Sequence, residues 1–183
     1  EKDVEQLKLD ELIGNVPIDL FLGGPPCQSF SVMGKHGGYD DNRGSLIYTF
    51  GKMVEKFRPR SFLFENVPNI KSPKWEEEFN KYCELFRSNG LYEVRDFILN
   101  CSEYGAATIR RRVFVLGILS SEKVKPTPPP PTHFKSSSPS LFSNELPWVT
   151  VRDALKGLPP PSYDFSFPDL HFAPRHRQEI IDR

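Results

Sequence analysis

The sequence has no excess of charge of either sign. Its 183 residues include 24 Lys and Arg and 24 Asp and Glu, so the formal net charge at pH 7 is zero. The strongly basic balance that usually accompanies a nucleic-acid-binding domain is therefore absent. Basic residues gathered on one stretch of the chain remain compatible with this overall neutrality.

The sequence is also poor in cysteine and has no long apolar run. Its three cysteines are Cys27, Cys83 and Cys101, an odd number without a CxxC pair. This usage argues against a disulfide framework or a zinc site, and it favours a reducing compartment. No stretch of about 18 apolar residues occurs, so no membrane-spanning helix is predicted. The length suffices for one domain with its own core.

Short apolar runs alternate with amphipathic stretches over the first two thirds of the chain. Pro59 ends one stretch with helical spacing, and Gly90 suits the C-terminal cap of the other. Such alternation favours an α/β fold in which helices cover a mostly parallel sheet, with an antiparallel member in the last strand pair. The expected strands are 18–24, 61–67, 92–100 and 111–119, and the expected helices are 45–57 and 75–90.

The composition changes after residue 120. Residues 125–147 are rich in Pro and Ser without periodicity, which predicts an extended linker or a segment that follows the surface. A short helix is expected within 149–161, ended by Gly157. We therefore divide the chain at 1–119, 120–148 and 149–183.

Polar residues follow the expected strands. Cys27 lies in "GGPPCQSFS" after the first strand, Glu65 ends the second, and three arginines precede the last. The carboxyl ends of parallel strands share one edge of a sheet, where ligands bind, so these groups are expected to converge. Each also has a common structural explanation: a small apolar cysteine, a salt-bridged glutamate and a solvated arginine run.

Three motifs in order carry a resemblance: "GGPPCQSFS" with "RGSL" downstream, "ENV", and "EYGAATIRRRVFVLG". They resemble the Pro-Cys-Gln, Glu-Asn-Val and Gln-x-Arg-x-Arg motifs of the DNA (cytosine-5)-methyltransferase family. The resemblance implies a Rossmann-like S-adenosylmethionine-dependent methyltransferase sheet, present in part. Residues 1–119 would belong to the catalytic domain, 120–148 would form a linker, and 149–183 would begin the target-recognition region.

The resemblance implies a covalent mechanism. The thiolate of Cys27 would add to C6 of cytosine, after which C5 takes the methyl group and the thiol leaves. Glu65 would hold a proton near the ring N3 as a general acid. Arg112 would contact the cytosine O2, and Arg110 would support the Cys27–Glu65 pair.

DNA and the cofactor are the implied ligands. The target cytosine must leave the duplex, and the glycine-rich stretch from 29 to 44 resembles the mobile loop that closes over DNA in the family. The implied DNA-binding residues are Gln28, Ser29, Lys35 and Arg43. The implied cofactor-binding residues are Asp3, Pro26 and Leu46, and no metal is expected. The family's glycine-rich cofactor loop is not found in this sequence.

The sequence departs from the family pattern at Ala107-Thr108, where Pro-Gln is usual, so a bracing contact of that turn is in question. Two alternatives stay open. One is a cysteine hydrolase, which needs a histidine paired with Cys27. The other is a non-catalytic or split-subunit partner without its own cofactor site. We expect double-stranded DNA and further segments, or a complementary subunit, as partners. The expected location is the cytoplasm or nucleoid of a prokaryote, or a eukaryotic nucleus.

Overall fold

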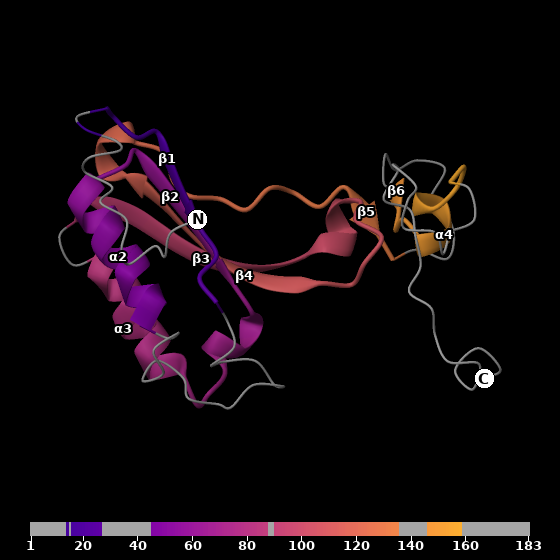
Figure 1. Ribbon diagram of the computed structural model, residues 1–183, viewed down its shortest axis with the longest axis horizontal. Helices are drawn as coiled ribbons and strands as arrows, with labels where there is room; N and C mark the ends of the chain where they lie inside the picture. The colour runs from indigo at the N-terminus through magenta and orange to yellow at the C-terminus, as the bar shows by residue number, and fades with distance from the viewer. Residues whose placement is uncertain (1–13, 15, 27–44, 88–89, 136–145, 159–183) are drawn as a thin grey trace, which may run out of the picture. The chain divides into compact units, whose positions relative to one another are not determined.

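A computed structural model describes residues 14, 16–26, 45–87, 90–135 and 146–158 (Figure 1). The chain forms two compact units, Glu1–Val149 and Thr150–Arg183. The strands of the first unit are β1 (Leu20–Gly23), β2 (Ser61–Asn66), β3 (Tyr92–Asn100), β4 (Arg111–Leu119), β5 (His133–Phe134) and β6 (Leu146–Pro147). Its helices are α2 (Ser45–Phe57) and α3 (Glu76–Arg87), with 3₁₀ turns η3 (Pro68–Lys71), η4 (Cys101–Tyr104) and η5 (Ser120–Glu122).

Four of these strands form one sheet in the order β1-β2-β4-β3. β1 and β2 are parallel, because a helix links them and returns the chain to the same end. β4 lies antiparallel to both of its neighbours, β2 and β3. The expected antiparallel strand near the end is confirmed, and the sheet as a whole is mixed, with three strands in one direction and β4 in the other.

The two helices pack on one face of this sheet (Figure 1). Alternation along β2 buries Phe62 and Phe64 on that face. The ring of Phe62 lies 4.4 Å from that of Phe86 on α3, between centroids, and Phe64 lies 5.3 Å from Tyr82. This aromatic core fixes the strand ends on which the polar motifs lie.

The face of strand β1 that points away from the helices is apolar and partly exposed. Leu20 and Leu22 pair with Ser61 and Leu63 of β2, so all four share the face away from the helices. The two leucines of β1 are 51% and 62% exposed. An apolar strand with half of its leucine surface in water presents a surface suited to further polypeptide.

The proline-rich segment follows the surface of the first unit. The amide of Thr132 donates to the carbonyl of Glu103 at 2.9 Å, and the hydroxyl of Tyr104 donates to the carbonyl of Pro129 at 3.0 Å. Of the two forms expected from composition, a free linker and a surface-following segment, the structure has the second for residues up to 135.

The described part of the second unit contains one short helix, α4 (Val151–Ala154). Thr150 and Asp153 form a capping box at its start. The helix lies within the expected 149–161 but ends at Ala154, three residues before Gly157, which has a φ of +88°. No helix among the described residues is long and apolar enough to cross a membrane.

Candidate active site

The ends of β1 and β2 bring two of the sequence motifs side by side. Gly23, the last residue of β1, pairs with Phe64, so the Gly-Pro-Pro turn begins beside Glu65 and Asn66. The side chain of Asn66 is 1% exposed. Its Nδ2 donates to the carbonyl of Pro25 at 3.2 Å, and its Oδ1 accepts from the Val67 amide at 2.9 Å. Asn66 thus ties the turn that leads into Cys27 to the end of β2.

Glu65 is held by an arginine of the neighbouring strand. Arg112 donates from Nε to Oε1 of Glu65 at 2.9 Å, with side chains 18% and 37% exposed, respectively. The guanidinium also donates from Nη1 to the carbonyl of Arg111 at 2.8 Å. Glu65 pairs with Phe114 in the sheet, so Arg112, two residues away on the same face, is its diagonal neighbour and within reach.

The two glycines at the end of β1 are needed for different reasons. A Cβ on Gly23 would lie 2.4 Å from the Phe50 ring, so this glycine lets α2 approach the strand. A Cβ on Gly24 would lie 3.1 Å from Oε2 of Glu65. The second carboxylate oxygen therefore faces the turn that Cys27 follows by three residues.

Arg110 contributes its backbone to the site. Its side chain is exposed, its amide donates to Oδ1 of Asn100 at 3.2 Å, and its carbonyl accepts from the Cys101 amide at 2.9 Å. The ion pair with Glu65 is made by Arg112, whereas the expected support of the Cys27–Glu65 pair by Arg110 involves Cys27, which lies outside the described residues. The cause of the Arg112 ion pair is the register: Glu65 pairs with Phe114, so Arg112 is two residues away along β4, whereas Arg110 precedes the strand and is four residues away. The side chain of Arg111 is exposed.

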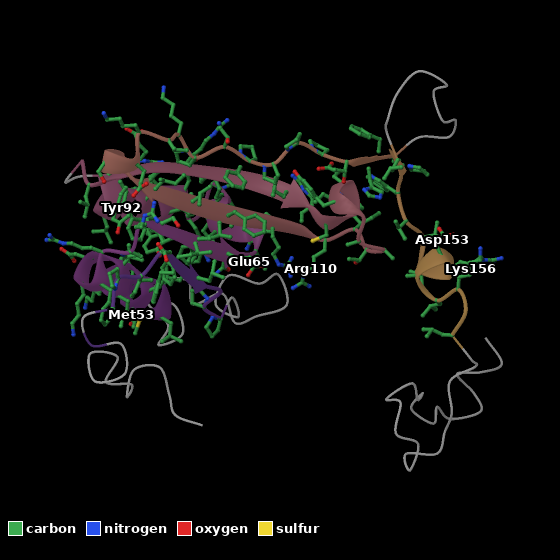
Figure 2. The ribbon with its side chains drawn as sticks, turned by 90° about the horizontal axis from the view of Figure 1, so that it is seen from above. Met53, Glu65, Tyr92, Arg110, Asp153 and Lys156 are labelled. Carbon is green, nitrogen blue, oxygen red and sulfur yellow. The ribbon has the colours of Figure 1, made fainter. Side chains whose placement is uncertain are left out.

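A cavity of about 300 Å³ lies between the Gly-Pro-Pro turn and the first half of α2. It brings together Pro26 and Leu46, the two described residues expected to bind the cofactor. Thr49 and Met53 also line it, with Met53 labelled in Figure 2. Sequence reasoning missed these two, although their spacing from Leu46 on one helix could have revealed them. The mostly apolar wall suits part of a nucleoside or methionine ligand.

The remaining expected site residues lie outside the described residues: Asp3, Cys27, Gln28, Ser29, Lys35 and Arg43. Of the two described cysteines, Cys83 differs from an activated nucleophile. Cys83 is 1% exposed in the core, and burial raises its pKa to about 12. Among the described residues no group of three or more His, Cys, Asp or Glu could hold a metal ion.

The mixed sheet, with helices on one face and polar motifs at adjoining strand ends, defines a Rossmann-like methyltransferase fold. A family model described as C-5 cytosine-specific DNA methylase matches residues 1–166. The chain belongs to this family.

Curated relatives and a solved structure agree with this assignment. The chain is 35% identical over 182 residues to the Type II methyltransferase M.AquIA of Picosynechococcus sp., covering 93% of this chain and 71% of the relative. It is 37% identical over 161 residues to M.MthTI of Methanothermobacter thermautotrophicus, covering 88% and 44%. A prophage-encoded protein of E. coli described as a DNA modification methyltransferase matches with a TM-score of 0.62 and 34% identity, covering 86% and 41%. The chain thus spans less than half of the last two proteins.

Proposed function

We propose that the protein carrying this chain is a DNA (cytosine-5)-methyltransferase that transfers a methyl group from S-adenosylmethionine to C5 of a flipped cytosine. Family membership supports the reaction. One observation carries the site: Arg112 holds one oxygen of Glu65, and the other oxygen faces Gly24, just before the Pro-Pro-Cys turn. A carboxyl group fixed beside the turn that leads into Cys27 could hold a proton near the ring N3 while the thiolate adds to C6.

Cys27 performs the first chemical step. Its thiolate adds to C6, and the electron pair of the C5–C6 double bond makes C5 nucleophilic. S-adenosylmethionine, when bound, supplies an electrophilic methyl group to which C5 forms a bond as the methyl–sulfur bond breaks. Loss of the C5 proton then restores the double bond and expels the thiolate. The C5 proton passes to a base such as solvent water, the proton at N3 returns to Glu65, and S-adenosylhomocysteine leaves with the electrons of the methyl–sulfur bond.

Glu65 assists this addition as a general acid. A proton that Glu65 shares with N3 withdraws electrons from C6 while the thiolate attacks. The bond from Arg112 fixes the carboxyl group, so no side-chain rotation is needed at that moment. Arg112 retains further guanidinium donors for the cytosine O2. Arg110 supports the Cys27–Glu65 pair through the backbone of its turn, where its carbonyl accepts from the Cys101 amide.

Pro26 and Leu46 form one wall of the proposed cofactor site, and their shared cavity supports this assignment. Asp3 is proposed as the acid near the adenine amine. Gln28, Ser29, Lys35 and Arg43 are proposed to contact double-stranded DNA.

The catalytic part would be 1–119, with 120–148 leading to the start of target recognition at 149–183. Relatives named Type II methyltransferases support a restriction–modification role at a prokaryotic nucleoid.

A split-subunit arrangement is the second candidate, favoured by the exposed leucines of β1. We propose that flanking segments of the same protein, or a complementary subunit, cover Leu20 and Leu22. Residues 1–183 alone should then bind S-adenosylmethionine weakly and transfer no methyl group. Calorimetry tests this directly, and micromolar cofactor binding by these residues alone would contradict it.

Covalent trapping tests the proposed reaction in the complete protein. DNA with 5-fluorocytosine should form a stable adduct, because fluorine cannot leave C5 as a proton does. Cys27→Ser should abolish the adduct, and Cys83→Ala should keep it, since the Cys83 thiol is buried with a pKa near 12. An adduct that survives Cys27→Ser would disprove the assignment of the nucleophile.

A further inference from the structure

Residues 129–133, which we call the strap, lie against the η4 turn through two backbone-directed bonds. The Thr132 amide donates to Glu103 O at 2.9 Å, and the Tyr104 hydroxyl donates to Pro129 O at 3.0 Å. One residue later, His133 Nδ1 lies 2.9 Å from the hydroxyl oxygen of Thr132. These contacts orient the imidazole at the end of the strap.

The imidazole of His133 lies directly over Gly105, the residue that ends η4. A Cβ on Gly105 would lie 2.8 Å from Cε1 and 3.2 Å from Nε2 of His133. Gly105 also has a φ of +86°, in the left-handed region that favours glycine. Glycine is therefore required at position 105 for two reasons: the positive φ of the turn and the close approach of the His133 ring.

The same turn determines where the arginines of the site lie. The Ala106 amide donates to the Cys101 carbonyl at 3.1 Å, and the Cys101 amide donates to the Arg110 carbonyl at 2.9 Å. Arg110 is followed directly by β4, which carries Arg112 to Glu65. Displacement of η4 would therefore displace the start of β4 and the guanidinium on Glu65.

We propose that His133 is a positioning residue for methyl transfer. By packing on Gly105 it holds the turn from 101 to 110, and through that turn it keeps Arg112 aligned on Glu65. The proposal rests on the proposed function for its kinetic consequence, but its structural part is independent of that function. His133 takes part in no chemical step itself. Through its contact with Gly105, it links the strap to the alignment of Arg112.

Three variants of the complete protein test the structural part by hydrogen exchange. His133→Ala should speed exchange of the Cys101, Ala106 and Arg110 amides by about tenfold, the size of a lost packing contact. His133→Phe keeps a flat ring over Gly105 and should retain most of the protection. Thr127→Ala, an exposed position in the same proline-rich segment, is the matched control and should change nothing.

A double-mutant cycle isolates the ring contact itself. Gly105→Ala should loosen the turn both by its positive φ and by its clash with the ring. In a His133→Ala background only the φ strain remains, so the second substitution should have a smaller effect, by a few-fold. Additive effects would mean that the ring and Gly105 do not act on each other, which would overturn the proposal.

Kinetics of the same variants test the catalytic part. His133→Ala should lower kcat on the order of tenfold with KM for DNA nearly unchanged, and His133→Phe should restore most of the rate. A raised KM with unchanged kcat would overturn the positioning role and assign His133 to DNA binding. Unchanged amide exchange in His133→Ala would also overturn the positioning role, whatever the methyl-transfer rate of that variant. Failure of the parent protein to methylate DNA would instead refute the proposed function.

Discussion

Two arginine–glutamate pairs lie at opposite ends of strand β2 and differ in how they use the carboxylate. At the amino end, Arg60 binds both oxygens of Glu122, from Nε at 3.0 Å and from Nη2 at 2.9 Å. Its Nη1 also donates to Asp19 at 3.0 Å. At the carboxyl end, the ion pair of Arg112 with Glu65 uses Oε1 alone, at 2.9 Å.

The arginine with the better geometry is the more exposed of the two. The Arg60 side chain is 58% exposed and ties together the segments before β1, before β2 and after β4. Exposed pairs of this kind are screened by water and salt, so they contribute little stability. The Arg112 side chain is 18% exposed, and the second oxygen of its partner faces the cysteine turn. We infer that the first pair is structural and that the second keeps an oxygen for substrate.

Replacing each glutamate with glutamine should give the largest difference in methyl-transfer rate between the two pairs. Glu65→Gln should lower the methyl-transfer rate on the order of 10²-fold or more, the usual size of a general-acid effect, with DNA affinity nearly unchanged. Glu122→Gln is the matched control and should leave the rate at the parent value. Single-turnover transfer and DNA titration provide the two readouts. Parallel loss of affinity without loss of turnover would make Glu65 structural.

Removing the arginine should have the next largest effect. Arg112→Met keeps much of the side-chain length but leaves Glu65 without its guanidinium, and about a tenfold loss of rate is expected, the equivalent of one hydrogen bond to a charged group. Arg110→Met tests the register, because the exposed Arg110 side chain is not the one paired with Glu65. If Arg110→Met lost more activity than Arg112→Met, the assignment of Glu65 support to Arg112 would be wrong.

Substitutions of Gly23 and Gly24 should have smaller effects, which distinguish a role in packing from a role in the site. Gly24→Ala should push the Glu65 carboxylate away by a few tenths of an ångström and slow transfer about fivefold, with the unfolding midpoint unchanged. Gly23→Ala should instead overpack the core against Phe50 and cost about 1–3 kcal/mol of stability. Urea unfolding beside the rate assay distinguishes the two. Equal destabilisation by both would show that Gly24 serves packing and not the site.

The helices and strands of residues 1–119 could largely be predicted from local sequence. The helix 45–57 and the strands 92–100 and 111–119 have the predicted bounds, because apolar periodicity and the neighbouring Pro and Gly residues are local signals. The position of β4 between β2 and β3 could not be predicted beyond one antiparallel member. Strand order depends on contacts between residues far apart in the sequence.

The sequence could propose a set of candidate site residues but not the contacts between them. The motifs identified Glu65 and the arginines, but the choice of Arg112 over Arg110 depends on the register of β2 with β4. The contact of His133 with Gly105 had no sequence signal, since the proline-rich segment has no periodicity and binds η4 through backbone groups. Thr49 and Met53 follow Leu46 at helical spacing, but only the fold shows that this part of α2 lines a cavity with the Gly-Pro-Pro turn.

The smallest expected effect belongs to the exposed pair and depends on pH. The hydrogen bond from Arg60 lowers the pKa of Glu122 in the folded protein. A carboxylate with a depressed folded pKa contributes its stability above its unfolded pKa, about 4.3 for glutamate, and loses it as the pH falls through the lower folded value. Arg60→Met should therefore lower the urea midpoint slightly at neutral pH and low salt, and the difference from the parent should disappear in acid and in high salt. Methyl transfer should be unaffected. A difference that persisted below both pKa values would mean that Arg60 acts through packing of its aliphatic chain and not through its charge.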